Sequence, residues 1–63
     1  MLKITVTPTT IFFEDMSDEV LSVIDGLRLE VYNAPKGYRV SSTPQKLYSL
    51  IVALAQDFDI EIV

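Results

Sequence analysis

Cysteine and histidine are both missing from this chain of 63 residues. Without them the chain can form no disulfide and none of the usual zinc sites. It also lacks the thiolate nucleophile and the commonest general base near neutral pH, which excludes nucleophilic triads. Carboxylate pairs remain, but catalysis also needs an enclosed pocket of roughly several hundred Å³, which so short a chain can hardly form. We therefore expect neither an enzyme nor a protein that carries a metal or another cofactor.

Long apolar runs and positive charge are scarce as well. No apolar stretch approaches the roughly 18 residues of a membrane span, and the N-terminus lacks the basic and hydrophobic segments of a secretory signal. We expect a soluble, cytoplasmic protein with no membrane contact. Nine acidic residues against five basic ones give a net charge of −4, the wrong sign for a protein that neutralises phosphates. Nonspecific nucleic-acid binding is therefore disfavoured.

The length allows a single small domain, residues 1–63, which buries only about 60% of the surface that its unfolded chain exposes. Small domains gain stability from disulfides, a metal or association with other chains. Only association remains here, either with another copy or with a different protein. The chain begins at a methionine and stops inside an alternating apolar segment, so two interpretations stay open: a complete small protein, or the N-terminal module of a longer one.

Alternating apolar residues predict strands at the start of the chain. Leu2, Ile4 and Val6 alternate with polar residues, as in a half-buried strand. Pro8, in "TPTT", has no amide to donate and suits the second position of a turn, so that "TIFFE" returns as a second strand. A single long strand bent at Pro8 is the alternative.

Two helices have clear start signals. Ser17 is expected to cap a first helix of about two turns, with Gly26 as the left-handed residue at its end. An apolar stripe lets this helix pack on a sheet: Val20, Leu21, Val23, Ile24 and Leu27. Thr43 is expected to cap the second helix, with Pro44 at the first helical position, where a missing amide costs nothing.

The segment between the helices, "LRLEVYNAPKGYRVSS", predicts a hairpin with "NAPKG" as its turn. One face of its first strand is expected to hold Leu27, Leu29 and Val31, and the other Arg28, Glu30 and Tyr32. Its second strand is expected to place Tyr38 and Val40 on one face, with Arg39 and Ser41 opposite. "DIEIV" is expected as a final strand with Ile60 and Ile62 inward.

The order of elements is therefore ββαββαβ, or βαββαβ if the first two segments form one strand. We expect an α+β fold: a mostly antiparallel sheet with two helices packed on one face, in the ferredoxin-like split βαβ pattern or a close variant. Many unrelated functions share this pattern, so function has to be argued from surface residues.

The second helix has more apolar residues than a sheet-packed helix requires. Its core stripe consists of Leu47, Leu50, Ile51, Leu54 and Phe58. A second stripe of Tyr48, Val52 and Ala55 widens the apolar arc to about 200°, where about 100° would serve. This stripe either covers the rim of the core near the first helix or forms a partner surface with Tyr48 as an aromatic anchor.

A second candidate surface is the face of the sheet away from the helices. If Ile11 and Phe13 face the core, Phe12 faces away and joins Tyr32 there. Basic and acidic residues are expected on the same face: Lys3, Arg28, Arg39, Glu30 and Glu61. Shielding by a neighbour, a shifted register or a different place for this strand would each explain Phe12 without function. The functional alternatives are protein docking, or stacking of nucleic-acid bases on the two aromatic rings.

Acidic residues gather before and within the first turn of the first helix: Glu14, Asp15, Asp18 and Glu19. Their spacing does not match a calcium loop. They either complement the helix dipole as a solvated run or, with the acidic residues near the C-terminus, attract a basic partner. The final segment "DIEIV" also predicts a sheet edge that can pair with another strand, partly protected by Asp59 and Glu61.

These observations favour a small acidic, non-catalytic protein-interaction module that self-associates or docks on a larger protein, which it regulates or inhibits. Its expected anchors are Tyr48, Val52, Phe12 and Tyr32. The alternative is an accessory nucleic-acid-contacting domain, as in the N-terminal module of a larger nucleic-acid enzyme, which would use Lys3, Arg28 and Arg39 with the aromatic residues.

Overall fold

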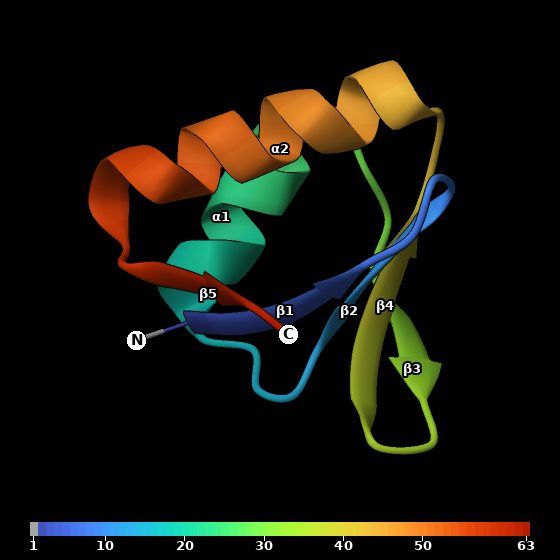
Figure 1. Ribbon diagram of the computed structural model, residues 1–63. Helices are drawn as coiled ribbons and strands as arrows, with labels where there is room; N and C mark the ends of the chain where they lie inside the picture. The colour runs from blue at the N-terminus through green and yellow to red at the C-terminus, as the bar shows by residue number, and fades with distance from the viewer. Residues whose placement is uncertain (1) are drawn as a thin grey trace.

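The computed structural model describes residues 2–63 and confirms the α+β fold, with a mostly antiparallel sheet and two helices on one of its faces (Figure 1). The strands are β1 (Leu2–Val6), β2 (Thr10–Phe13), β3 (Tyr32–Ala34), β4 (Gly37–Ser41) and β5 (Ile60–Ile62). The helices are α1 (Asp18–Gly26) and α2 (Pro44–Asp57).

The five strands lie in the order β3-β4-β2-β1-β5. β2 and β3 are both antiparallel to β4, which lies between them, so β2, α1 and β3 form a split βαβ unit. β1 lies between β2 and β5, and it pairs in parallel with β5. The fold is therefore a close variant of the ferredoxin-like pattern, with one additional strand inserted beside the C-terminal strand.

The first two strands form a hairpin, and the alternative of one bent strand is wrong. Thr7 donates its backbone N–H to the carbonyl oxygen of Thr10 at 2.8 Å, and Thr10 donates its own N–H to Thr7 Oγ1 at 2.9 Å. Pro8 occupies the second position of this turn, where its fixed φ is favourable and its missing amide has no ladder partner to lose.

Both predicted helix starts are confirmed. Ser17 Oγ accepts the N–H of Val20, and Thr43 Oγ1 accepts the N–H of Lys46, each at 3.3 Å. Pro44 is the first residue of α2. Each cap satisfies one of the amides that the first turn of a helix leaves without an internal acceptor.

The predicted end of α1 is wrong. Gly26 is the last helical residue, and the left-handed residue is Arg28, with φ of 58°. Arg28 donates its N–H to the carbonyl of Asp25 at 2.9 Å, and Leu29 donates its N–H to that of Ile24 at 3.2 Å. This is a Schellman ending, and it turns Leu29 back toward the core against which it packs. Packing of Leu29 therefore outweighs the conformational preference of glycine.

The third strand is shorter than predicted, because residues 27–31 form no strand. The end of α1 occupies Leu27 to Leu29, and β4 pairs only with Tyr32–Ala34. The hairpin itself is confirmed, with Pro35 and Lys36 between its strands. Gly37 has φ of +137°, and a Cβ added there would lie 2.2 Å from the carbonyl oxygen of Phe13, so only glycine fits.

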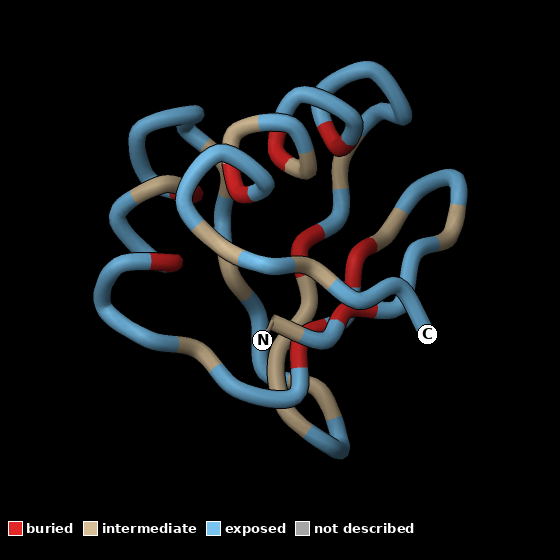
Figure 2. The backbone as a smooth tube through the Cα atoms, turned by 60° about the vertical axis from the view of Figure 1, so that its left-hand side comes forward, coloured by how far each residue is buried: buried red, intermediate tan, exposed pale blue. Residues whose placement is uncertain are grey.

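The core lies between the helices and the sheet (Figure 2). Its buried residues are Ile4, Ile11, Phe13, Val20, Ile24, Val40, Leu47, Leu50 and Leu54. The prediction of an inward Ile60 holds, since it is half-buried, but Ile62 is 61% exposed. Ile62 pairs with the buried Ile4 and so lies on the helix side of the sheet. It belongs to the edge strand, where the helix layer leaves it uncovered.

Candidate docking surfaces

The four predicted anchors lie on two opposite sides of the protein. Phe12 and Tyr32 are 38% and 44% exposed on the open face of the sheet, away from the helices. Tyr48 and Val52 are 68% and 42% exposed on α2. A single partner surface cannot readily cover both pairs, so each side has to be judged separately.

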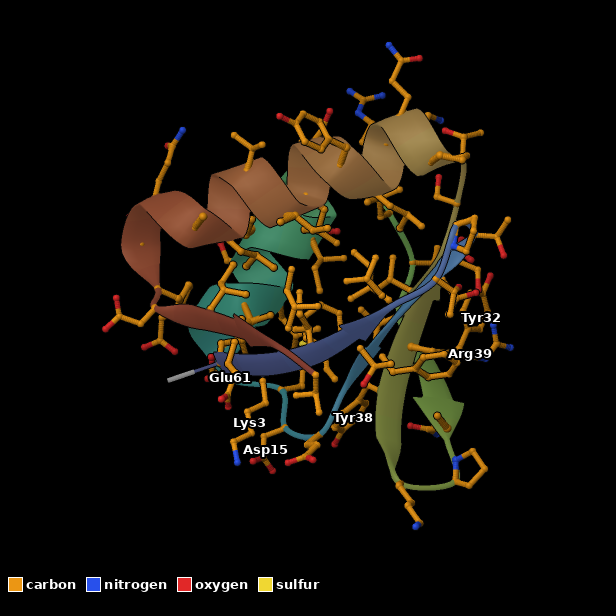
Figure 3. The ribbon with its side chains drawn as sticks, in the orientation of Figure 1. Lys3, Asp15, Tyr32, Tyr38, Arg39 and Glu61 are labelled. Carbon is orange, nitrogen blue, oxygen red and sulfur yellow. The ribbon has the colours of Figure 1, made fainter. Side chains whose placement is uncertain are left out.

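On the open face, four residues form one cross-strand row. Tyr32 of β3 lies opposite Arg39 of β4, which lies opposite Phe12 of β2, which lies opposite Thr5 of β1. The guanidinium carbon of Arg39 is 4.9 Å from the centroid of the Tyr32 ring, within the range of a cation–π contact (Figure 3). Arg39 also donates from Nη1 to Ser41 Oγ at 3.1 Å. The row is thus held by contacts within the chain.

The phenol of Tyr32 is also engaged. Its hydroxyl donates a hydrogen bond to the Glu30 carboxylate at 2.5 Å. This bond, together with the negative charge of Glu30, raises the pKa of Tyr32 above its ordinary value of 10.0, while the charge of Arg39 acts in the opposite direction. Both the ring and the hydroxyl of Tyr32 therefore have partners.

The basic residues predicted for this face are only partly brought together. Arg39 contacts Tyr32, and Lys3 on β1 lies opposite Glu61 on β5. Arg28 lies outside the sheet, in the turn after α1, so it takes no part in the row. The open face consequently carries charges of both signs rather than a basic stripe.

A hollow of about 370 Å³ lies at one end of the open face, beside the β3–β4 turn. Apolar surface dominates its lining, which includes Phe12, Pro35, Tyr38 and Val63. Lys3, Lys36 and Glu14 add charged groups of opposite sign. Because charges of both signs line this hollow, it favours neither an anionic nor a cationic ligand.

The second side lies where the first half of α2 passes over the end of β1 and the β1–β2 turn. A hollow of about 340 Å³ is lined there by Val6, Thr7, Pro8, Pro44, Leu47, Tyr48 and Ile51. Among these lining residues only Thr7 and Tyr48 carry a hydroxyl, and the other five are apolar. Val6 is 37% exposed, and Ile62, on the same side of the sheet, is 61% exposed. We call Val6, Tyr48, Val52 and Ile62 the edge surface.

The backbone of β5 adds unpaired polar groups to this side. Leu2 donates its N–H to the carbonyl of Asp59 at 2.7 Å, and Val63 donates its N–H to the carbonyl of Ile4 at 2.8 Å. Residues 59, 61 and 63 therefore direct their backbone groups toward β1. Ile60 and Ile62 direct theirs away from it, past the last strand of the sheet described for residues 2–63.

The four acidic residues of the β2–α1 connection and the first turn of α1, Glu14, Asp15, Asp18 and Glu19, are all exposed. Asp18 and Glu19 complement the positive end of the α1 dipole. Within the described part of the chain, no group of three or more acidic side chains is placed to hold a metal ion. Neither helix is long and apolar enough to cross a membrane.

Sequence reasoning did not find Val6 and Ile62, since alternation placed both in the core. Their exposure depends on the position of β1 and β5 at one side of the sheet, which no local pattern specifies. No protein-family model matches this chain, and neither a curated protein nor a solved structure matches it. The surfaces themselves therefore carry the functional argument.

Proposed function

We propose that this chain is a small, non-catalytic protein-interaction module that docks through the edge surface and so regulates or inhibits a larger protein. The position of Tyr48 carries the proposal. This aromatic side chain is 68% exposed and lines an apolar hollow whose wall includes the buried Leu47. A partner side chain entering that hollow would remove apolar surface on both molecules from water.

The neighbours of Tyr48 support docking rather than packing within the chain. Val52 lies one helical turn further along the same stripe of α2, and Val6 lies across the hollow on β1. Aromatic anchors surrounded by aliphatic side chains are typical of the energetic centre of protein interfaces. The net charge of −4 would add orientation and speed to association with a basic partner.

The open face offers weaker support for either docking or nucleic-acid binding. A base that stacks on the face of Tyr32 that Arg39 covers would have to compete with this cation–π contact. Cross-strand pairing of Phe12 with Arg39 and with Thr5 gives Phe12 neighbours on both sides within the sheet face. We therefore assign the function to the edge surface.

Capture from an extract of the native cells tests the proposal. The immobilised chain is compared with Tyr48→Ala and with Tyr32→Ala, a control that removes the same side chain from the opposite side. We expect a partner that is retained by the unchanged chain and the control, and is weakened by Tyr48→Ala by about 1 to 2 kcal/mol or more. Retention by Tyr48→Ala with loss on Tyr32→Ala would place the interface on the open face and contradict the proposal.

Self-association is measured in parallel by sedimentation equilibrium from roughly micromolar to millimolar concentration. A dimer that dissociates in Tyr48→Ala would identify the docked protein as a second copy. A monomer that also captures no partner would leave the edge surface without an occupant and would refute a docking role.

A further inference from the structure

We propose that the partner binds as an added antiparallel β-strand along the outer edge of β5, and that this strand alternates apolar with basic residues. The inference rests on the proposed docking function and specifies its binding mode and the chemistry of the partner. It follows from the backbone geometry of β5, from the two different faces of that strand and from its charges.

The backbone geometry supplies the first step. Ile60 and Ile62 each direct an N–H and a C=O away from β1, while the bonds of Asp59 and Val63 hold β5 on the sheet. In an antiparallel pair, such a residue exchanges both of its backbone hydrogen bonds with the residue opposite. A partner strand can therefore pair with β5 at two successive positions without disturbing the ladder to β1.

The two faces of β5 supply the second step. On the helix side are the half-buried Ile60 and the exposed Ile62, and Ile62 lies opposite Ile4, two residues before Val6 on β1. On the open side are the carboxylates of Asp59 and Glu61, both exposed. Residues paired across a sheet share a face. Alternate side chains of a strand added to β5 would therefore lie beside Ile60 and Ile62, and the side chains between them would lie beside the carboxylates of Asp59 and Glu61.

The charges favour basic residues in that second set. Lys3 of β1 lies opposite Glu61, so a lysine or arginine on the incoming strand would place the carboxylate between two cations across three strands (Figure 3). Acidic residues on the partner would instead face Asp59 and Glu61 directly. The net charge of −4 repels an acidic partner at longer range as well.

The same charges disfavour a second copy as the added strand. An antiparallel register with Ile60 opposite Ile62 places two Glu61 carboxylates opposite one another. A register with Ile60 opposite Ile60 places Asp59 opposite Glu61. Only a register centred on Ile62 avoids these pairs, and it uses a single hydrogen-bonded position of β5. A different, basic chain therefore fits this edge better than the chain itself.

A synthetic peptide tests the inference directly. The probe is about eight residues of alternating valine and lysine, a usual strand length, and the matched control replaces each lysine with glutamate. Amide hydrogen exchange is followed by NMR for each residue of the 63-residue chain. The lysine peptide is expected to slow exchange at Ile60 and Ile62, whose amides point outward, and the glutamate peptide to leave both unchanged.

Two substitutions separate backbone pairing from apolar contact. Ile62→Pro removes the outward N–H but leaves the amides of Glu61 and Val63 free to bond with β1, and proline is tolerated at sheet edges. We expect it to weaken peptide binding by roughly tenfold or more. Ile62→Val keeps both the amide and the branched side chain and is expected to bind as the unchanged chain does. Glu61→Gln removes only a charge, so we expect it to weaken peptide binding less than Ile62→Pro does and to reduce the salt dependence of binding.

Three results would overturn the inference. The first is no protection of Ile60 and Ile62 with the lysine peptide at about 1 mM. The second is binding that survives Ile62→Pro. The third is protection of both amides that grows with protein concentration without peptide, which would make the added strand a second copy. None of these results removes a partner captured through Tyr48, so strand addition can fail while the docking function stands.

Discussion

The open face and the edge surface each expose a tyrosine, but their surroundings differ. Tyr32 has Arg39 over its ring and Glu30 on its hydroxyl. Tyr48 has neither kind of contact within residues 2–63, and it lines an apolar hollow instead. Both tyrosines are exposed, so the exposed fraction alone does not show which of them is available to a partner. What separates them is whether the chain already supplies partners for the aromatic side chain, and this criterion selects the edge surface for docking.

The substitution with the largest expected effect is Gly37→Ala, which disrupts the open face. Gly37→Ala places a Cβ 2.2 Å from the carbonyl of Phe13 at φ of +137°, so we expect the free energy of unfolding to fall by about 4 kcal/mol or more. The β3–β4 hairpin that carries Tyr32 and Arg39 would be lost first. Denaturant titration measures the change.

The other glycine is the control for this substitution. An added Cβ at Gly26 meets no atom within 4 Å, and the residue is helical, so Gly26→Ala should stabilise the protein by up to about 1 kcal/mol. Equal effects of the two substitutions would show that β4 does not pack against Phe13 as described.

The second prediction contrasts two consecutive residues of α2. Leu47 is 2% exposed and Tyr48 is 68% exposed. Leu47→Ala should lower the free energy of unfolding by about 3 kcal/mol, because it leaves a cavity in the core. Tyr48→Ala should change it by less than about 0.5 kcal/mol, because the side chain is largely in water. Thermal and denaturant unfolding of both variants provides the measurement, and a large loss in Tyr48→Ala would assign Tyr48 to the core.

The smallest expected effect is a shift in the titration of Tyr32. Its pKa lies above the ordinary value, so the folded state favours the protonated phenol. The associated stability is fully present below the unfolded pKa and is lost as pH rises through the folded one. Glu30→Gln removes the charge that raises this pKa and should shift the Tyr32 titration to lower pH, as followed by phenolate absorbance. An unchanged titration would mean that Glu30 does not hold the phenol in solution.

Local signals in the sequence were sufficient for the helix starts and the first turn. Ser17 and Thr43 act through hydrogen bonds to residues three positions later, and Pro8 acts through its own fixed φ, so their roles can be read without knowledge of the fold. Arg28 shows the limit of such signals. Gly26 is the better left-handed residue by itself, but packing of Leu29 against the core sets the helix end two residues later.

The sequence predicted only part of the edge surface. The wide apolar arc of α2 predicted that Tyr48 and Val52 lie beyond the core stripe, and both are exposed. Alternation could place Val6 and Ile62 on the helix side of the sheet, but it could not show that the helices stop short of them. That depends on the insertion of β1 between β2 and β5, which is a pairing between distant segments.

The parallel ladder between β1 and β5 also sets an order of folding. Its bonds join Leu2 to Asp59 and Ile4 to Val63, so the loop that it closes contains almost every other residue described. Closing so long a loop before other contacts form is entropically unfavourable, whereas the β1–β2 and β3–β4 hairpins close short ones. During synthesis, one edge of β1 stays unpaired until residues 60–62 have left the ribosome.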